Sequence, residues 1–185
     1  MLSYILKAYK SGNYDVIVWD TAPAGGTLNL LRLEDKFYRH LGEAAKLYLR
    51  VKGVLEQIKR GGKDPLSIIN SWRKLVDEVM EMLRAETTGA VIVTIPEALS
   101  VDQLDRIYKE LTSFRMKVAH IVINGILIDD LDCEFRRKRA QMQKKYIDYT
   151  VKKYGKNLGV TLLPLLPSEI KGLNSLFEVV KYLFK

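Results

Sequence analysis

Short runs rich in Val and Ile recur along the chain and alternate with segments of helical periodicity, and this alternation limits the folds available to it. The runs have the length and composition of buried strands, and they are Tyr14–Trp19, Ala90–Ile95, Val118–Ile123 and Val160–Leu165. Apolar residues recur with the helical period over Ser100–Phe114, Glu134–Tyr154 and Leu173–Phe184. Strands that alternate with helices predict βαβ units and a mostly parallel sheet flanked by helices.

A long insertion separates the first two predicted strands and contains no convincing strand of its own. It covers about residues 28–86, is broken at Arg60–Pro65 and resumes a helical pattern over Ser67–Arg84. We therefore expect residues 1–185 to form a single α/β domain that carries a helical subdomain as an insertion.

The composition is that of a globular protein, because 48% of the 185 residues are apolar and 28% are charged. No run approaches the length of a membrane-spanning helix, and the first eleven residues lack a cleavable signal pattern. The single cysteine, Cys133, cannot form an internal disulfide. These features predict a cytoplasmic protein.

The net charge of +8 is concentrated in one segment. Cys133–Lys156 holds nine basic and two acidic residues. A basic helix can bind nucleic acid, but the tyrosines within it also fit packing against a core. We favour a solvent-facing or subunit-facing helix and do not expect nucleic acid as a partner; salt-dependent binding to duplex DNA would reverse that preference.

Ligands of open parallel sheets bind where the strands end, so the residues after each predicted strand are the candidate site. The first strand ends in Asp20, a carboxylate suited to hold Mg²⁺, and small residues follow it. The third ends in Asn124, whose amide can pair with an adenine edge or simply form a turn. The fourth runs into Pro164–Glu169, which can cover a base or cap the last helix.

Four segments together resemble the ArsA/anion-transporting ATPase family, which includes arsenite-pump ATPases and the ATPases that target tail-anchored membrane proteins. The switch II motif of the family resembles Asp20–Leu31, and its Ile-Pro-Glu-x-Leu-Ser segment matches Ile95–Ser100. Its Val-Asn-Gln segment is similar to Ile123–Gly125, and its last motif resembles Pro164–Leu173. The resemblance implies a P-loop NTPase-like fold of the deviant Walker A class.

The resemblance also implies roles for particular residues. Asp20 would be the catalytic Walker B carboxylate near Mg²⁺, and Asn124 would meet the adenine of ATP. Four further nucleotide-binding residues would flank the base: Pro164, Leu165, Leu166 and Pro167. Switch II would comprise Asp20, Thr21, Ala22, Pro23, Ala24, Gly25, Gly26 and Thr27.

The helical insertion would correspond to part of the subdomain that forms an apolar client groove in the targeting branch. Met80 and Met82 would either adapt to such clients or be ordinary core residues. We favour the second interpretation.

The phosphate-binding loop (P-loop) of the family has no counterpart here, because the sequence contains no G-x-x-x-x-G-K-[ST]. Gly62-Lys63 is followed by Asp64-Pro65, and no apolar strand precedes it, so we interpret it as an ordinary loop. Without backbone amides to hold phosphate, Asp20 has no Mg-nucleotide to act on. We therefore expect the C-terminal part of such an ATPase, with the N-terminal part of the fold missing, no ATP hydrolysis by this chain alone and no tightly bound cofactor.

Two positions depart from the family pattern. Gly26 stands where the switch II motif has His. Cys133 and Arg136 stand where many members have Cys-x-x-Cys, which joins two subunits through zinc. Because tetrahedral zinc at a two-fold axis needs two thiolates from each chain, we do not expect zinc at Cys133. Arsenite, which prefers clustered thiolates, is disfavoured for the same reason.

Two hypotheses from different functional classes follow. In the first, the chain belongs to an ATPase that uses ATP and Mg²⁺ for anion pumping or membrane-protein targeting, with a missing N-terminal part or a second subunit as its partner; a homodimer is also compatible. In the second, it is a non-catalytic interaction module that binds an apolar client helix, a membrane protein or a partner chain.

Overall fold

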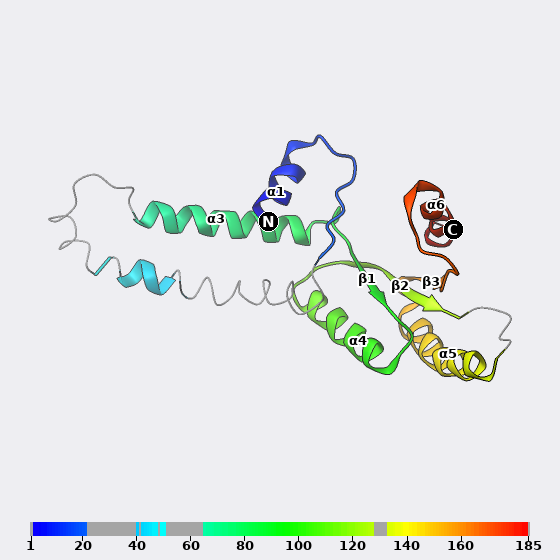
Figure 1. Ribbon diagram of the computed structural model, residues 1–185. Helices are drawn as coiled ribbons and strands as arrows, with labels where there is room; N and C mark the ends of the chain where they lie inside the picture. The colour runs from blue at the N-terminus through cyan, green and yellow to red at the C-terminus, as the bar shows by residue number, and fades with distance from the viewer. Residues whose placement is uncertain are drawn as a thin grey trace. The chain divides into compact units, whose positions relative to one another are not determined.

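The computed structural model describes residues 2–21, 40, 42–47, 49–50, 65–127 and 133–184. Its described part divides into two compact units, Met1–Ala85 and Glu86–Lys185, and each is described by itself. The architecture is α/β, with a parallel sheet flanked by helices (Figure 1). This confirms the predicted fold class, whereas the expectation of a single domain stays a prediction.

In the first unit, α1 (Leu2–Ser11) and α3 (Pro65–Arg84) pack against each other, and residues 40, 42–47 and 49–50 are also helical. Lys10 Nζ on α1 lies 2.8 Å from a Glu78 carboxylate oxygen on α3. Met80 and Met82 of α3 are buried, which confirms their interpretation as core residues. Of the predicted helical insertion, residues 28–39, 41, 48 and 51–64 lie outside the described residues.

The predicted strand Tyr14–Trp19 is wrong for this structure, because residues 12–21 carry neither helix nor strand. A strand satisfies its backbone N–H and C=O groups through a paired neighbour, and no described residue pairs with this segment. Val16 and Val18 are accordingly 76% and 86% exposed.

The second unit is built on three parallel strands, β1 (Ala90–Thr94), β2 (Val118–Ile126) and β3 (Gly159–Pro164), in the order β1-β2-β3. They confirm the other three predicted strands to within a few residues. Ile121 of β2 is the register partner of Ile92 on β1 and of Val160 on β3. The β2–β3 register shifts at Gly125, which has a φ of 74° and so occupies backbone space that favours glycine.

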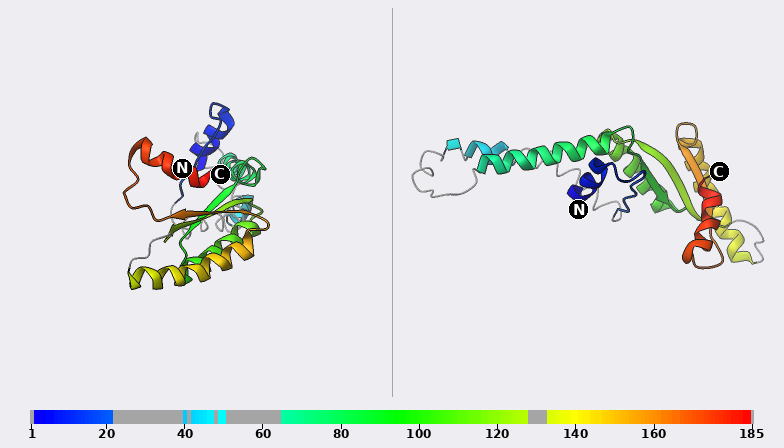
Figure 2. Two further views of the ribbon diagram at one scale, coloured as in Figure 1. Left: turned by 90° about the vertical axis from the view of Figure 1, so that its right-hand side faces the viewer. Right: turned by 90° about the horizontal axis from the view of Figure 1, so that it is seen from above.

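Two helices connect the strands, α4 (Ala98–Ser113) and α5 (Glu134–Tyr154), and α6 (Gly172–Leu183) follows β3. Figures 1 and 2 show α4 and α5 on one face of the sheet and α6 on the other. Two successive right-handed crossovers in one direction place both connecting helices on the same face. That face carries fully buried residues from the sheet and the helices: Leu104, Ile121, Ile123 and Thr150.

No helix among the described residues is long and apolar enough to cross a bilayer.

Candidate functional site

A cavity of about 340 Å³ lies where the three strands of the second unit end. Residues that follow β1, β2 and β3 form one side of it, and the first half of α5 forms the other. The lining residues are Ile95, Pro96, Glu97, Gly125, Leu127, Phe135, Arg136, Arg139, Gln143 and Leu165. Its position at the carboxyl ends of parallel strands is the one at which α/β proteins bind ligands.

The walls combine apolar surface with a few polar groups, as small-molecule sites do. Among the lining residues, Pro96 is fully buried, whereas Phe135 and Leu165 are exposed. Two arginines, Arg136 and Arg139, contribute positive charge. The lining therefore combines apolar side chains with two arginines and one carboxylate, that of Glu97.

The two arginines differ in their partners. Arg139 Nη2 donates a hydrogen bond to the carboxylate of Glu97, which follows β1. Among the described residues, no carboxylate pairs with Arg136. Of the two arginines, Arg139 is therefore the one whose charge is balanced by a described carboxylate.

Gln143 fixes the backbone where β2 ends. Its side chain is buried, Nε2 donates a 3.1 Å hydrogen bond to the carbonyl of Gly125, and Oε1 accepts a 2.9 Å bond from the amide of Leu127. A buried backbone group without a partner costs free energy, so this one side chain satisfies two backbone groups at the register shift. Gln143 therefore couples α5 to the wall of the cavity.

A second cluster fastens α5 to α4. The Asp105 carboxylate of α4 accepts hydrogen bonds from Tyr149 (2.7 Å), Lys153 (2.5 Å) and Tyr154 (2.6 Å), all on α5. The Tyr154 ring also packs against Tyr108, with 4.9 Å between the ring centroids. These contacts show that two tyrosines of the basic helix face the protein, and they hold the helix that lines the cavity.

Charge and burial act together on the ionisation of this cluster. Burial alone would raise the pKa of Asp105, but the hydrogen bonds from Lys153, Tyr149 and Tyr154 outweigh it and hold that pKa below its ordinary value. Burial alone would lower the pKa of Lys153, yet its hydrogen bond to Asp105 raises that pKa above the ordinary value. Burial and the hydrogen bond to Asp105 both raise the pKa of Tyr154.

The structure brings part of the predicted nucleotide-binding set together. Asn124 on β2 is the register partner of Leu163, directly before Pro164. The Leu165 amide donates a 2.8 Å hydrogen bond to the carbonyl of Ile126. Leu165 lines the cavity, whereas Asn124 is exposed and is not among the lining residues. Of the remaining predicted residues, Leu166 is half-buried and Pro167 is exposed.

The predicted switch II residues belong to the first unit. Asp20 and Thr21 are exposed, and Ala22, Pro23, Ala24, Gly25, Gly26 and Thr27 lie outside the described residues. The role of Asp20 in Mg²⁺ binding stays a prediction. One carboxylate is consistent with that role, because Mg²⁺ commonly takes one or two protein carboxylates together with nucleotide phosphates.

Cys133 is exposed and directly precedes α5. In the ranges that the structure describes, no group of three His, Cys, Asp or Glu side chains could hold a metal ion. The prediction that no zinc binds at Cys133 rests on the sequence alone.

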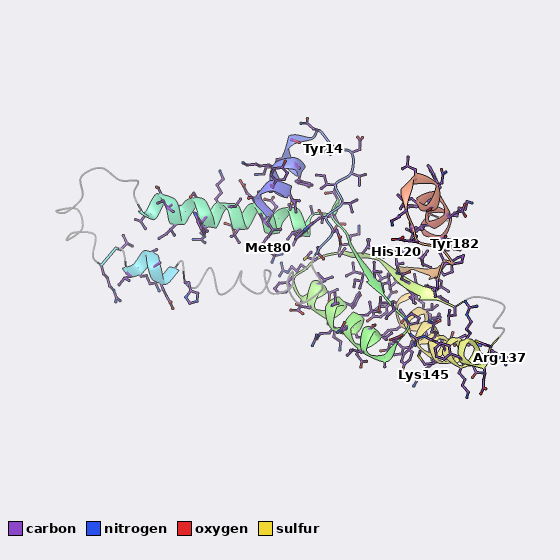
Figure 3. All side chains as sticks on the ribbon, viewed as in Figure 1. Tyr14, Met80, His120, Arg137, Lys145 and Tyr182 are labelled. Atoms are coloured by element: carbon purple, nitrogen blue, oxygen red, sulfur yellow. The ribbon has the colours of Figure 1, made fainter. Side chains whose placement is uncertain are left out.

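Sequence reasoning missed the contribution of α5 to the cavity. The sequence pattern predicted that the basic residues of this helix face solvent. Arg137 and Lys145 do so (Figure 3). Arg136, Arg139 and Gln143 stand three and four residues apart, so they share one helix face. That spacing, with a glutamine among the basic residues, was the available signal.

A parallel sheet flanked by helices, with a cavity at its carboxyl edge, places the second unit among the open α/β folds, which bind ligands at that edge. The family model for the anion-transporting ATPases matches residues 1–185, and the chain belongs to that family, whose fold is that of the P-loop NTPases.

Similar proteins are found in several eukaryotes. The chain is 31% identical over 180 residues to the ATPase ASNA1 homolog of Dictyostelium discoideum, covering 93% of this chain and 54% of that protein. It is 33% identical over 183 residues to ATPase GET3A of Arabidopsis thaliana (93% and 52%) and 36% identical over 178 residues to ATPase GET3 of Komagataella phaffii (93% and 52%). The chain therefore spans about half the length of these curated relatives.

Proposed function

We propose that this chain is the C-terminal part of an ATPase that binds and hydrolyses ATP with Mg²⁺, and that hydrolysis requires a P-loop supplied by a further section of protein. Membership of the anion-transporting ATPase family supports the reaction class. The observation that carries the proposal is the cavity at the carboxyl edge of the sheet, with its apolar walls and two arginines.

Particular residues of this chain would have distinct roles in binding Mg²⁺ and ATP. Asp20 would hold Mg²⁺, which neutralises phosphate charge when it is bound. Asn124 would contact the adenine, and Pro164–Pro167 would flank it. Gly26 leaves switch II without the histidine side chain that the family motif carries at this position. Coupling to anion pumping or to membrane-protein targeting in the cytoplasm is part of the proposal, as is a second subunit or P-loop section as partner.

The proposal is tested by joining this chain to a section of protein that carries a P-loop. A chimera in which the chain replaces the matching half of Arabidopsis GET3A is titrated with ATP and Mg²⁺ by calorimetry. We expect binding to the chimera and none at the same concentrations to the chain alone. Arg136→Ala in the chimera should weaken binding several-fold, whereas Lys144→Ala, an exposed basic residue of α5 outside the cavity lining, should leave it unchanged. An intact chimera that binds no ATP would contradict the proposal.

A second candidate function, a non-catalytic interaction module, is favoured by the exposed apolar side chains of α6. Leu173, Leu176 and Phe177 are each at least half exposed. Such a module would capture an apolar helix equally well with and without ATP. The pull-down of an apolar helical peptide by the chain alone, in both conditions, distinguishes it from the ATPase.

A further inference from the structure

Gln143 and Thr150 are buried polar residues of α5, and their side chains have different partners. The Thr150 hydroxyl donates a 2.9 Å hydrogen bond to the carbonyl of Tyr146, within its own helix, which is a common arrangement for threonine in helices. Gln143, only 4% exposed, instead reaches the sheet and bonds to the backbone of Gly125 and Leu127. A buried amide costs free energy unless it is hydrogen-bonded, so the place of Gln143 in α5 depends on the end of β2.

The strand end that Gln143 holds contains an extra residue. Asn124 and Ile126 of β2 are the register partners of two consecutive residues of β3, so Gly125 between them has no partner in that ladder. Such an insertion bends the strand and changes the direction of neighbouring side chains, and it is frequent beside active sites. The hydrogen bond from Gln143 to the Gly125 carbonyl therefore stabilises the distortion that directly follows Asn124.

The same strand end also holds the loop that follows β3. The carbonyl of Ile126 accepts a 2.8 Å hydrogen bond from the amide of Leu165, and the amide of Leu127 donates one of 2.9 Å to Gln143 Oε1. Residues 125–127 thus each have one backbone partner in another element. Gln143 is the partner of the first and the last, and Leu165 is the partner of the middle one.

We infer that Gln143 is a positioning residue for the base of the nucleotide. Through residues 125–127 it fixes Asn124 and the loop Pro164–Pro167 relative to each other, and it needs no contact with the nucleotide itself. This inference rests on the proposed function, in which Asn124 and that loop contact the adenine. It assigns to a residue of the basic helix a part in the choice between ATP and GTP.

Base selectivity depends on the position of Asn124 because its side-chain amide presents both a donor and an acceptor. The matching edge of adenine presents one acceptor and one donor, whereas the same edge of guanine presents two acceptors. An amide held in one orientation therefore favours ATP, and an amide that can turn or shift can donate to either base. Releasing the strand end should lower the preference for ATP, beyond any loss of affinity that both nucleotides share.

The preference is measured as the ratio of the ATP and GTP dissociation constants of the GET3A chimera described above. Gln143→Met keeps the length of the side chain and removes both hydrogen bonds. We expect it to reduce the preference for ATP about five-fold, the discrimination that roughly one hydrogen bond provides, and to approach the preference of Asn124→Ala. Gln141→Met, which replaces an exposed glutamine of the same helix, should leave the preference unchanged.

A second variant allows for a Gln143→Met protein that does not fold, as judged by circular dichroism. Gln143→Glu keeps the length of the side chain and an acceptor for the Leu127 amide, so it should lose only part of the preference for ATP. If the chimera itself does not fold, the two halves are co-expressed as separate chains, and the same ratios are measured on their complex.

Several outcomes would overturn the inference and leave the proposed function intact. Equal losses of affinity for ATP and GTP in Gln143→Met would show a general loosening of the cavity, and unchanged affinities would show no role at all. Asn124→Ala with the native preference, or a native chimera without one, would show that Asn124 does not distinguish the bases. A folded native chimera that binds no ATP would instead refute the proposed function, and the inference with it.

Discussion

The side-chain amide of Gln143 on α5 donates a 3.1 Å hydrogen bond to the carbonyl of Gly125, at the point where the β2–β3 register shifts. The same side chain accepts a hydrogen bond from Leu127, so a residue in the middle of a charged helix fixes the end of the central strand. The cavity at the carboxyl edge depends on this contact, because Gly125, Leu127 and Gln143 all line it.

Replacing Gln143 with Ala should destabilise the protein by about 1–3 kcal/mol, because two half-buried backbone groups lose their partner. Urea unfolding followed by circular dichroism measures the change. Gln141→Ala is the matched control, since Gln141 is exposed on the same helix, and it should change the free energy of unfolding by less than about 0.5 kcal/mol. Equal effects of the two substitutions would show that the contact is unimportant.

Asp105→Ala should also destabilise the protein by about 1–3 kcal/mol, because Lys153, Tyr149 and Tyr154 lose their shared acceptor. Asp102→Ala removes an exposed carboxylate from the same helix and is the control. The free energy of unfolding should fall clearly only for Asp105. An Asp105→Ala protein as stable as the Asp102→Ala protein would refute the role of this cluster in holding α5.

The Asp105 cluster makes a prediction about pH. Because the pKa of Asp105 is lowered in the folded protein, its contribution to stability is present above the unfolded pKa, about 3.9, and is lost as pH falls through the folded pKa. The difference in unfolding free energy between the native protein and Asp105→Asn should therefore be larger at pH 7 than at pH 2.5. A difference that does not depend on pH would contradict this.

At alkaline pH, the raised pKa values of Lys153 and Tyr154 make stability fall as pH rises, which is the opposite of the effect of Asp105. Their contribution is complete below an unfolded pKa of about 10 and is lost as pH rises further. Tyr154→Phe should reduce the loss of stability between pH 9 and pH 11, as thermal melts would show. An unchanged loss would assign the alkaline transition to other groups.

Gly159 of β3 lies directly against His120 of β2, so an alanine methyl group at this position would overlap the imidazole ring. The ring would have to move and would lose its 2.8 Å hydrogen bond with Thr161 Oγ1. Gly159→Ala should cost about 1 kcal/mol or more. In a double-mutant cycle, His120→Ala should recover part of that loss, and strict additivity would show that the two residues do not interact.

The sequence predicted the parts of the fold that local pattern determines. Val and Ile runs located β1, β2 and β3, and apolar periodicity located α4, α5 and α6. It failed at Tyr14–Trp19, where the same pattern has no paired neighbour among the described residues, because strand formation depends on a partner as well as on composition. It also missed α1, a ten-residue helix whose packing against α3 is a tertiary contact.

Only part of the candidate site could be predicted from the sequence, for a related reason. Leu165 follows β3 and was named from that position, whereas Asn124 lies on β2 and is not among the residues that line the cavity. Arg136, Arg139 and Gln143 lie on a helix whose charge predicts a solvated surface, and the packing of α5 on α4 through Asp105 turns one face of that helix toward the cavity.

ATP turnover tests the central claim most directly. It is measured with and without Mg²⁺ for the chain alone, for the GET3A chimera and for the chimera with Asp20→Asn. We predict no turnover by the chain alone and Mg²⁺-dependent turnover by the chimera. The Asp20→Asn chimera should lose at least ~100-fold, because the carboxylate that would hold Mg²⁺ is removed. Mg²⁺-dependent turnover by the chain alone that Asp20→Asn abolishes would contradict the account.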